Sequence, residues 1–264
     1  MELFEHVFNK AMIYDALFFN IKSVLEFPTI TELKNNKPKL YDQWDFLCRK
    51  KYGMNDSNID NAEDMMMQDL YDKYAVYYPE YTKIVAITYA TVYSENNTLK
   101  RNFKKIIGTD ELKNIESFQK VLLQISSDGV SSTPQYFPTL CGYNIINYDI
   151  PFLIKRLLTH RDELEFKTIP FLLKKYLQSK PWDSDIVDVI NIWKFNGKDY
   201  TNLNMLSDYL GLKRNVDLIS PIELSNYYWA NIEEKEKETL DFIGLQSANQ
   251  TNLIIQFLNE LRQL

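Results

Sequence analysis

The segment LCGYNIINYDIPFLIKR, residues 140–156, joins a short apolar strand to an apolar helix that Pro151 opens. This junction places Asp149 directly after the strand and at the mouth of the helix. A carboxylate is stabilised there by the partial positive charge of the helix N-terminus. Open α/β sheets also bind ligands at the carboxyl ends of their strands. Asp149 is therefore a candidate site residue, and the alternative is that it only caps the helix.

Apolar patterns on both sides of this segment predict an α/β fold. Strands are expected at 12–24, 83–93, 99–107 and 139–145, and helices at 109–125, 151–164, 202–212 and 232–263. Strands come first and helices interleave later, which is typical of a mixed sheet flanked by helices. Residues 28–74 predict a polar loop and helix insertion, irregular up to its final helix, with Trp44, Phe46 and Leu47 as anchors. We expect residues 1–264 to form a single domain.

The composition limits the classes of function. The 264 residues include 30 Lys and Arg against 36 Asp and Glu, so any nucleic-acid site has to be a local patch. Two cysteines exclude a disulfide scaffold, and the presence of only two histidines argues against a His-built zinc site. No apolar run approaches the roughly 18 residues of a membrane span, and the first residues lack a signal-peptide pattern. We therefore expect a cytoplasmic protein without a membrane partner.

Six segments, taken in order from about residue 15 to 260, resemble the predicted 3′–5′ exonucleases related to the proofreading domain of family B DNA polymerases. This family belongs to the ribonuclease H-like DEDD superfamily. The segment 140–156 is similar to its second exonuclease motif, LFFNIKSV (17–24) takes the place of the first, and FIGLQSANQTNLIIQFL (242–258) takes the place of the third. The other matching segments are 77–90, 180–195 and 201–212. The resemblance implies a DnaQ-like exonuclease fold, a ribonuclease H-like mixed sheet flanked by helices.

The resemblance also implies a reaction that this chain is not equipped to perform. Active members use four carboxylates to hold two Mg²⁺ or Mn²⁺ ions that hydrolyse the 3′-terminal phosphodiester. Here the first motif has Asn20 for its Asp and Lys22 for its Glu, while the second keeps Asp149. In the third motif Gln246 replaces the Asp, and Phe242 replaces the Tyr that positions water. The four carboxylate positions carry no net charge, so we predict no metal site and no cofactor, with Lys22 paired to Asp149 instead.

Three interpretations stay open. The first is a pseudoenzyme that binds nucleic acid or acts as an interaction or structural module. The second is an active Mg²⁺- or Mn²⁺-dependent exonuclease whose site is rearranged around nearby acids. These acids would be Asp15, Asp183, Asp188 and Asp241, although Asp188 is also expected to cap the helix that follows it. The third is an unrelated binding protein on a similar fold. Departures at Ser23, Phe242 and Ile243 argue against engineered inactivation.

Four residues are candidates for nucleic-acid contacts. Asn144 and Asn147 can hydrogen-bond a substrate, or can simply satisfy the loop around Asp149. Trp182 can stack on a terminal base, with core or rim packing as the alternative. Arg156 belongs to a modest basic cluster that can contact phosphate or form a solvated helix face. The candidate partners are the 3′ end of single-stranded nucleic acid and another protein, and the expected origin is bacterial or viral.

Overall fold

A five-stranded mixed sheet organises the described part of the chain. The computed structural model describes residues 16–52, 60–96, 98–126, 138–164, 186–194, 197 and 201–261. The strands are β1 (Ala16–Leu25), β2 (Thr82–Glu95), β3 (Thr98–Ile107), β4 (Thr139–Gly142) and β5 (Ile186–Asp188). Their order across the sheet is β3-β2-β1-β4-β5. β1 pairs with β4 and β4 with β5 in parallel, whereas β2 and β3 are antiparallel. The predicted mixed α/β class is confirmed.

The helices fall before, between and after these strands. They are α3 (Ile30–Asn36), α4 (Pro38–Tyr52), α5 (Asp60–Tyr74), the 3-10 turns η1 (Ala75–Tyr77) and η2 (Pro79–Tyr81), α6 (Glu111–Ser126), α7 (Asp149–Thr159), α9 (Val189–Lys194), α10 (Leu203–Leu210), α11 (Pro221–Asn231) and α12 (Glu236–Leu261). No helix among the described residues is both long and apolar enough to cross a bilayer.

The chain groups into two compact units. The first comprises the described residues within 1–22, 85–218 and 240–264, and the second those within 23–84 and 219–239. Three of the four boundaries fall inside β1, β2 and α12, and the fourth lies between α10 and α11. The single domain expected for residues 1–264 stays a prediction.

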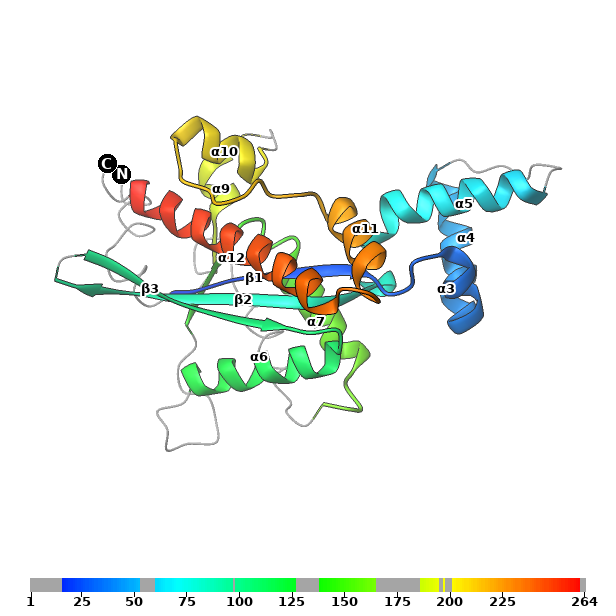
Figure 1. Ribbon diagram of the computed structural model, residues 1–264, viewed down its shortest axis with the longest axis horizontal. Coiled ribbons are helices and arrows are strands. Elements are labelled where there is room, and N and C mark those ends of the chain that lie inside the picture. Colours follow the sequence, from blue (N-terminus) through cyan, green and yellow to red (C-terminus); the bar gives the residue numbers. More distant parts are fainter. Residues whose placement is uncertain are drawn as a thin grey trace. The chain divides into compact units, whose positions relative to one another are not determined.

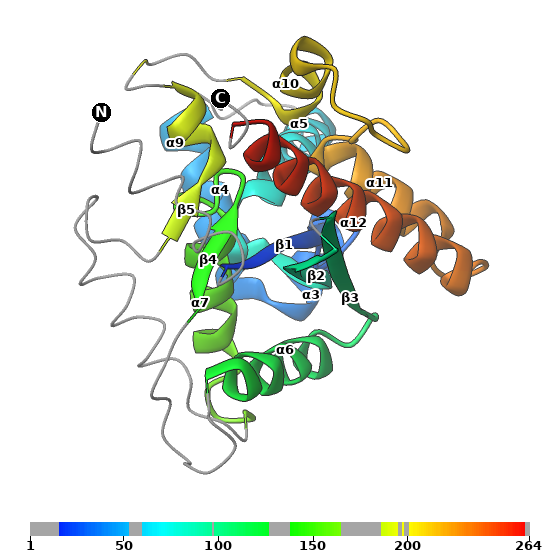
Figure 2. The ribbon, with the colours of Figure 1, turned by 90° about the vertical axis from the view of Figure 1, so that its left-hand side faces the viewer.

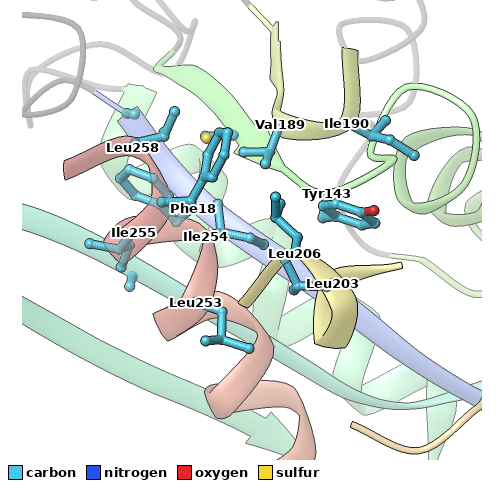
Figure 3. Packing of buried hydrophobic residues seen from close by; sticks show 14 of the residues in the cluster. Phe18, Tyr143, Val189, Ile190, Leu203, Leu206, Leu253, Ile254, Ile255 and Leu258 are labelled. Carbon is cyan, nitrogen blue, oxygen red and sulfur yellow. The ribbon is translucent and has the colours of Figure 1, made fainter. Parts of the chain in front are cut away.

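In the first unit, helices cover both faces of the sheet. Figures 1 and 2 show α12 over one face and α6 and α7 over the other. Successive side chains of a strand point to opposite faces. Phe18 accordingly packs with Ile254 and Leu258 of α12, together with Leu206 of α10 (Figure 3). The next residue, Phe19, lies against Phe118 of α6, with ring centroids 5.4 Å apart. Burial on both faces explains the continuous apolar run of β1.

The second unit is more regular than the sequence indicated. Residues 28–74 were expected to be irregular up to a final helix, which is wrong, because α3 and α4 precede α5. Two of the three predicted anchors are confirmed. Trp44 is fully buried, and its ring meets those of Tyr71 and Tyr81 edge-on. Leu47 is partly buried against the same cluster. Phe46 is not an anchor, since it is 60% exposed. Most side chains of α3 and α4 are polar and exposed, so the few apolar positions that pack inward do not form a clear helical pattern in the sequence.

Most of the other predicted elements are confirmed with shifted ends. The helix expected at 109–125 is α6, and the one expected at 202–212 is α10. Asn202 caps the start of α10 by accepting from the Met205 N–H, and Gly211 ends it at φ 64°. The helix expected from Pro151 begins two residues earlier, at Asp149. The final helix starts at Glu236, and α11 was not predicted. Residues 12–15 of the first predicted strand lie outside the described residues.

Candidate functional site

The candidate site lies in the first unit, where β1 and β4 run parallel and α12 crosses β1. Phe18 of β1 is in register with Cys141 of β4, and Gly142 of β4 with Asp188 of β5. The chain continues from β4 to Asp149, the first residue of α7. Asn20 and Lys22 follow Phe18 at alternate positions of β1, so the three side chains share the face that α12 covers. The carboxyl ends of parallel strands thus bring together positions from the first and second sequence motifs.

Asn20 is held by three hydrogen bonds to α12. Its Nδ2 donates to the carbonyl of Ser247 at 2.9 Å and to the hydroxyl of Thr251 at 2.5 Å. Its Oδ1 accepts from the Ser247 hydroxyl at 2.7 Å. All three side chains are buried. The amide oxygen and both amide hydrogens are therefore used within the protein.

Lys22 points to the same helix, between the two residues that bind Asn20. Its Nζ donates to Oε1 of Gln250 at 2.5 Å. Burial lowers the pKa of the Lys22 ammonium to about 8, and the negative charge of Asp149 opposes this decrease. An ammonium thus occupies the position at which the resemblance implies a carboxylate.

Asp149 links α7 to β1. Its Oδ1 accepts the backbone N–H of Ile21 at 2.8 Å, and the side chain is only 3% exposed. Burial raises the pKa of Asp149 to about 7, against the opposing effects of the Ile21 N–H and the Lys22 charge, while the charge of Asp188 adds to the increase. The residue that caps α7 is Tyr148, which makes no side-chain capping bond. The alternative that Asp149 only caps the helix is therefore wrong.

A second buried carboxylate, Asp188, organises the loop that leads to Asp149. Its oxygens accept the backbone N–H groups of Asn144 at 2.7 Å and Ile146 at 3.1 Å. They also accept the N–H of Ile190 at 3.2 Å, which confirms the predicted cap of the following helix. Asn144 has a φ of 58°, and these bonds hold it in that left-handed conformation. Burial raises the pKa of Asp188, and the three N–H donors oppose this increase.

The two third-motif positions identified from the sequence, Gln246 and Phe242, both lie on α12. Gln246 is buried, and its Nε2 donates to the carbonyl of Asp217 at 3.0 Å. Phe242, one turn earlier on α12, is partly buried. Within the described ranges, no three His, Cys, Asp or Glu side chains come together as a group that could hold a metal ion.

The candidate nucleic-acid residues and the acids of the rearranged-site alternative lie in different environments. Asn147 is exposed and donates to the Asn144 side chain at 3.1 Å. Arg156 is buried in an ion pair with Glu111, which also contacts His160 at 2.9 Å. Asp241 is exposed on α12. Asp15, Trp182 and Asp183 lie outside the described residues.

Sequence reasoning missed Ser247, Gln250 and Thr251. The available signal was helical spacing, because residues three and four apart lie on one face of α12. That spacing shows which residues share a face, but it does not show which face meets β1.

No family model matches the chain, and a search of curated proteins found no significant match.

Proposed function

We propose that this protein is an exonuclease-like pseudoenzyme with a ribonuclease H-like fold. It lacks two-metal 3′–5′ exonuclease activity and acts as a nucleic-acid-binding or interaction module. The observation that carries the proposal is the internal bonding of the motif positions, in which Asn20 and Lys22 are hydrogen-bonded to α12 and Asp149 to β1. The ordered motif resemblance supports the exonuclease relationship, and the strand order β3-β2-β1-β4-β5 is compatible with it.

The residues present do not fit a pair of divalent cations. Mg²⁺ and Mn²⁺ require several anionic or neutral oxygen ligands. Asp149 offers one carboxylate, and one of its oxygens already accepts the Ile21 N–H. The Asn20 oxygen accepts the Ser247 hydroxyl, and the neighbouring Lys22 brings a positive charge. This charge repels a dication, and in a partly dry site the repulsion is weakly screened.

The test is incubation of the pure protein with 3′-labelled single-stranded DNA and RNA in Mn²⁺ or Mg²⁺. We expect no trimming of either substrate. Metal-dependent 3′ trimming that disappears in Asp149→Ala would overturn the proposal and favour the active enzyme with a rearranged site. A Lys237→Ala variant, changed at an exposed position outside the site, is the matched control.

Restoration of the carboxylates gives a second test. One variant combines Asn20→Asp, Lys22→Glu, Gln246→Asp and Phe242→Tyr, as the motif alignment requires. A second replaces Gln246→Asp with Gln250→Asp, because Gln250 is the residue that meets Lys22. Activity in either folded variant would support a retained exonuclease surface that lost only its metal ligands. Inactivity of both, with folding confirmed by circular dichroism, would argue against the exonuclease relationship.

A further inference from the structure

The β2–β3 hairpin is locally basic, whereas the chain as a whole is acidic. Between Ala86 and Ile107 it holds four cations and one anion, Glu95, although the whole chain has a net charge of −6. The cations are Lys100, Arg101, Lys104 and Lys105. All four lie on β3, which is one of the two edge strands of the sheet among the described residues. A local basic region on an acidic protein is the pattern expected of a polyanion-binding surface.

The strand register sorts these cations between the two faces. Arg101 donates to Asn252 of α12, so it lies on the α12 face. Lys105, four residues later, shares that face, and its Cδ lies near Gly244 of α12. Lys100 and Lys104 therefore point to the opposite face. Among the described residues, the side chains of these two lysines take part in no hydrogen bond or ion pair.

Aromatic side chains stand beside both lysines on that opposite face. Tyr93 is directly across from Lys100, and Tyr89 is directly across from Lys104. Thr91 and Asn102 form the polar pair between them. Side chains paired in this way have Cβ atoms about 5 Å apart. The result is two neighbouring tyrosine–lysine pairs along the hairpin.

Side chains on the outer part of this face are exposed. The Tyr89 ring lies 6.1 Å from that of Phe118, which places this end of the row against α6. Figure 1 shows the hairpin continuing past the end of α6. Tyr93, in that distal part, is 48% exposed. An exposed ring next to a cation is the arrangement on which a base can stack while its phosphate is neutralised.

We propose that the face formed by Tyr89, Thr91, Tyr93, Lys100, Asn102 and Lys104 binds single-stranded nucleic acid. A base stacks on Tyr93, Lys100 and Lys104 contact phosphates, and the Asn102 amide supplies a hydrogen bond. The surface is separate from the cluster around Asp149. The structural alternative is that these lysines only protect an edge strand from pairing with another chain.

The test is fluorescence polarisation of a labelled oligothymidylate, about 20 nucleotides long, at ~50 to ~200 mM salt. The parent chain is compared with Lys100→Glu/Lys104→Glu and with Lys235→Glu/Lys237→Glu, a control that changes net charge equally at exposed residues of the second unit. We expect the hairpin variant to bind at least tenfold more weakly, with a salt slope reduced by about 1.4 for two lost phosphate contacts. We expect the control to change affinity less than threefold.

Tyr93 provides the test of stacking. Tyr93→Ala is expected to weaken binding about fivefold or more, whereas Tyr93→Phe retains the ring and the affinity. If the charge-reversed hairpin variant does not fold, Lys100→Gln/Lys104→Gln takes its place. Absence of binding by the parent chain at ~50 mM salt, or equal losses in the hairpin and control variants, would overturn the proposal. Equal affinity for a duplex of the same length would overturn the single-strand assignment. Because the readout is binding, its outcome is independent of the exonuclease assay.

Discussion

Removing the opposite charges of Lys22 and Asp149, singly and together, measures how strongly they depend on each other. Asp149→Asn keeps an oxygen for the Ile21 N–H but deprives the Lys22 ammonium of its negative neighbour. Lys22→Met leaves the buried Asp149 carboxylate without its nearby positive charge. The double variant places two neutral side chains of similar size in the same space. Each single variant therefore leaves one charge without the opposite charge beside it, whereas the double variant removes both charges.

The pKa values set the scale. Raising the pKa of Asp149 from 3.8 to about 7 corresponds to about 4 kcal/mol against its ionised form, at about 1.4 kcal/mol per pH unit. Lowering the pKa of Lys22 from 10.5 to about 8 corresponds to about 3 kcal/mol against its charged form. Lys22 keeps partial exposure, so water reduces the second figure more than the first. Because both charged forms are disfavoured in the folded protein at about pH 7.5, we expect the double variant to be more stable than the parent. Each single variant should gain less than its own figure, because it also removes the attraction of the opposite charge.

Urea unfolding followed by circular dichroism at about pH 7.5 gives the four free energies. We expect a favourable coupling energy of about 1–3 kcal/mol between the two sites. The matched control is the Lys37–Glu26 ion pair, which has an N–O distance of 2.7 Å but lies nearer the surface, and for which about 1 kcal/mol or less is expected. A double variant whose change in stability equals the sum of the two single changes would refute the reasoning, because the charges would then act independently.

Three further predictions concern the first unit. The pKa of Asp149 is raised and that of Lys22 is lowered, so both charged forms disfavour folding most between pH 7 and 8. The stability of the parent relative to the double variant should therefore be smallest in this range and should increase toward pH 5 and toward pH 10. Urea titrations across this range check it. Gly142→Ala should cost about 1–3 kcal/mol, since a Cβ there would lie 2.8 Å from Cβ of Ile145; an unchanged thermal midpoint would contradict this. Glu111→Gln should cost about 3 kcal/mol in chemical denaturation, because it leaves the buried Arg156 guanidinium without its carboxylate; a loss under 1 kcal/mol would show that the pair contributes little.

Much of the local structure could be predicted because its causes are local. The continuous apolar run of β1 reports burial on both faces. The start of α10 follows from Asn202, whose side chain accepts the backbone N–H of Met205 three residues later. Its end follows from Gly211, which adopts φ 64°. The charges at positions 20, 22 and 149 are properties of the residues themselves. The zero net charge of Asn20, Lys22, Asp149 and Gln246 could therefore be inferred before any packing was known.

Contacts across the fold could not be predicted in this way. Asn20 meets Ser247 and Thr251 although more than 200 residues separate them, and the pairing depends on which face of α12 packs on β1. The burial of Arg156 depends in the same way on Glu111 of another helix. Periodicity identifies a helix and its faces, but it carries no information on the partner of each face. The amino-acid sequence by itself determined that the motif positions are neutral in sum, and only the tertiary structure decided that α12 supplies the amide and hydroxyl groups that satisfy them.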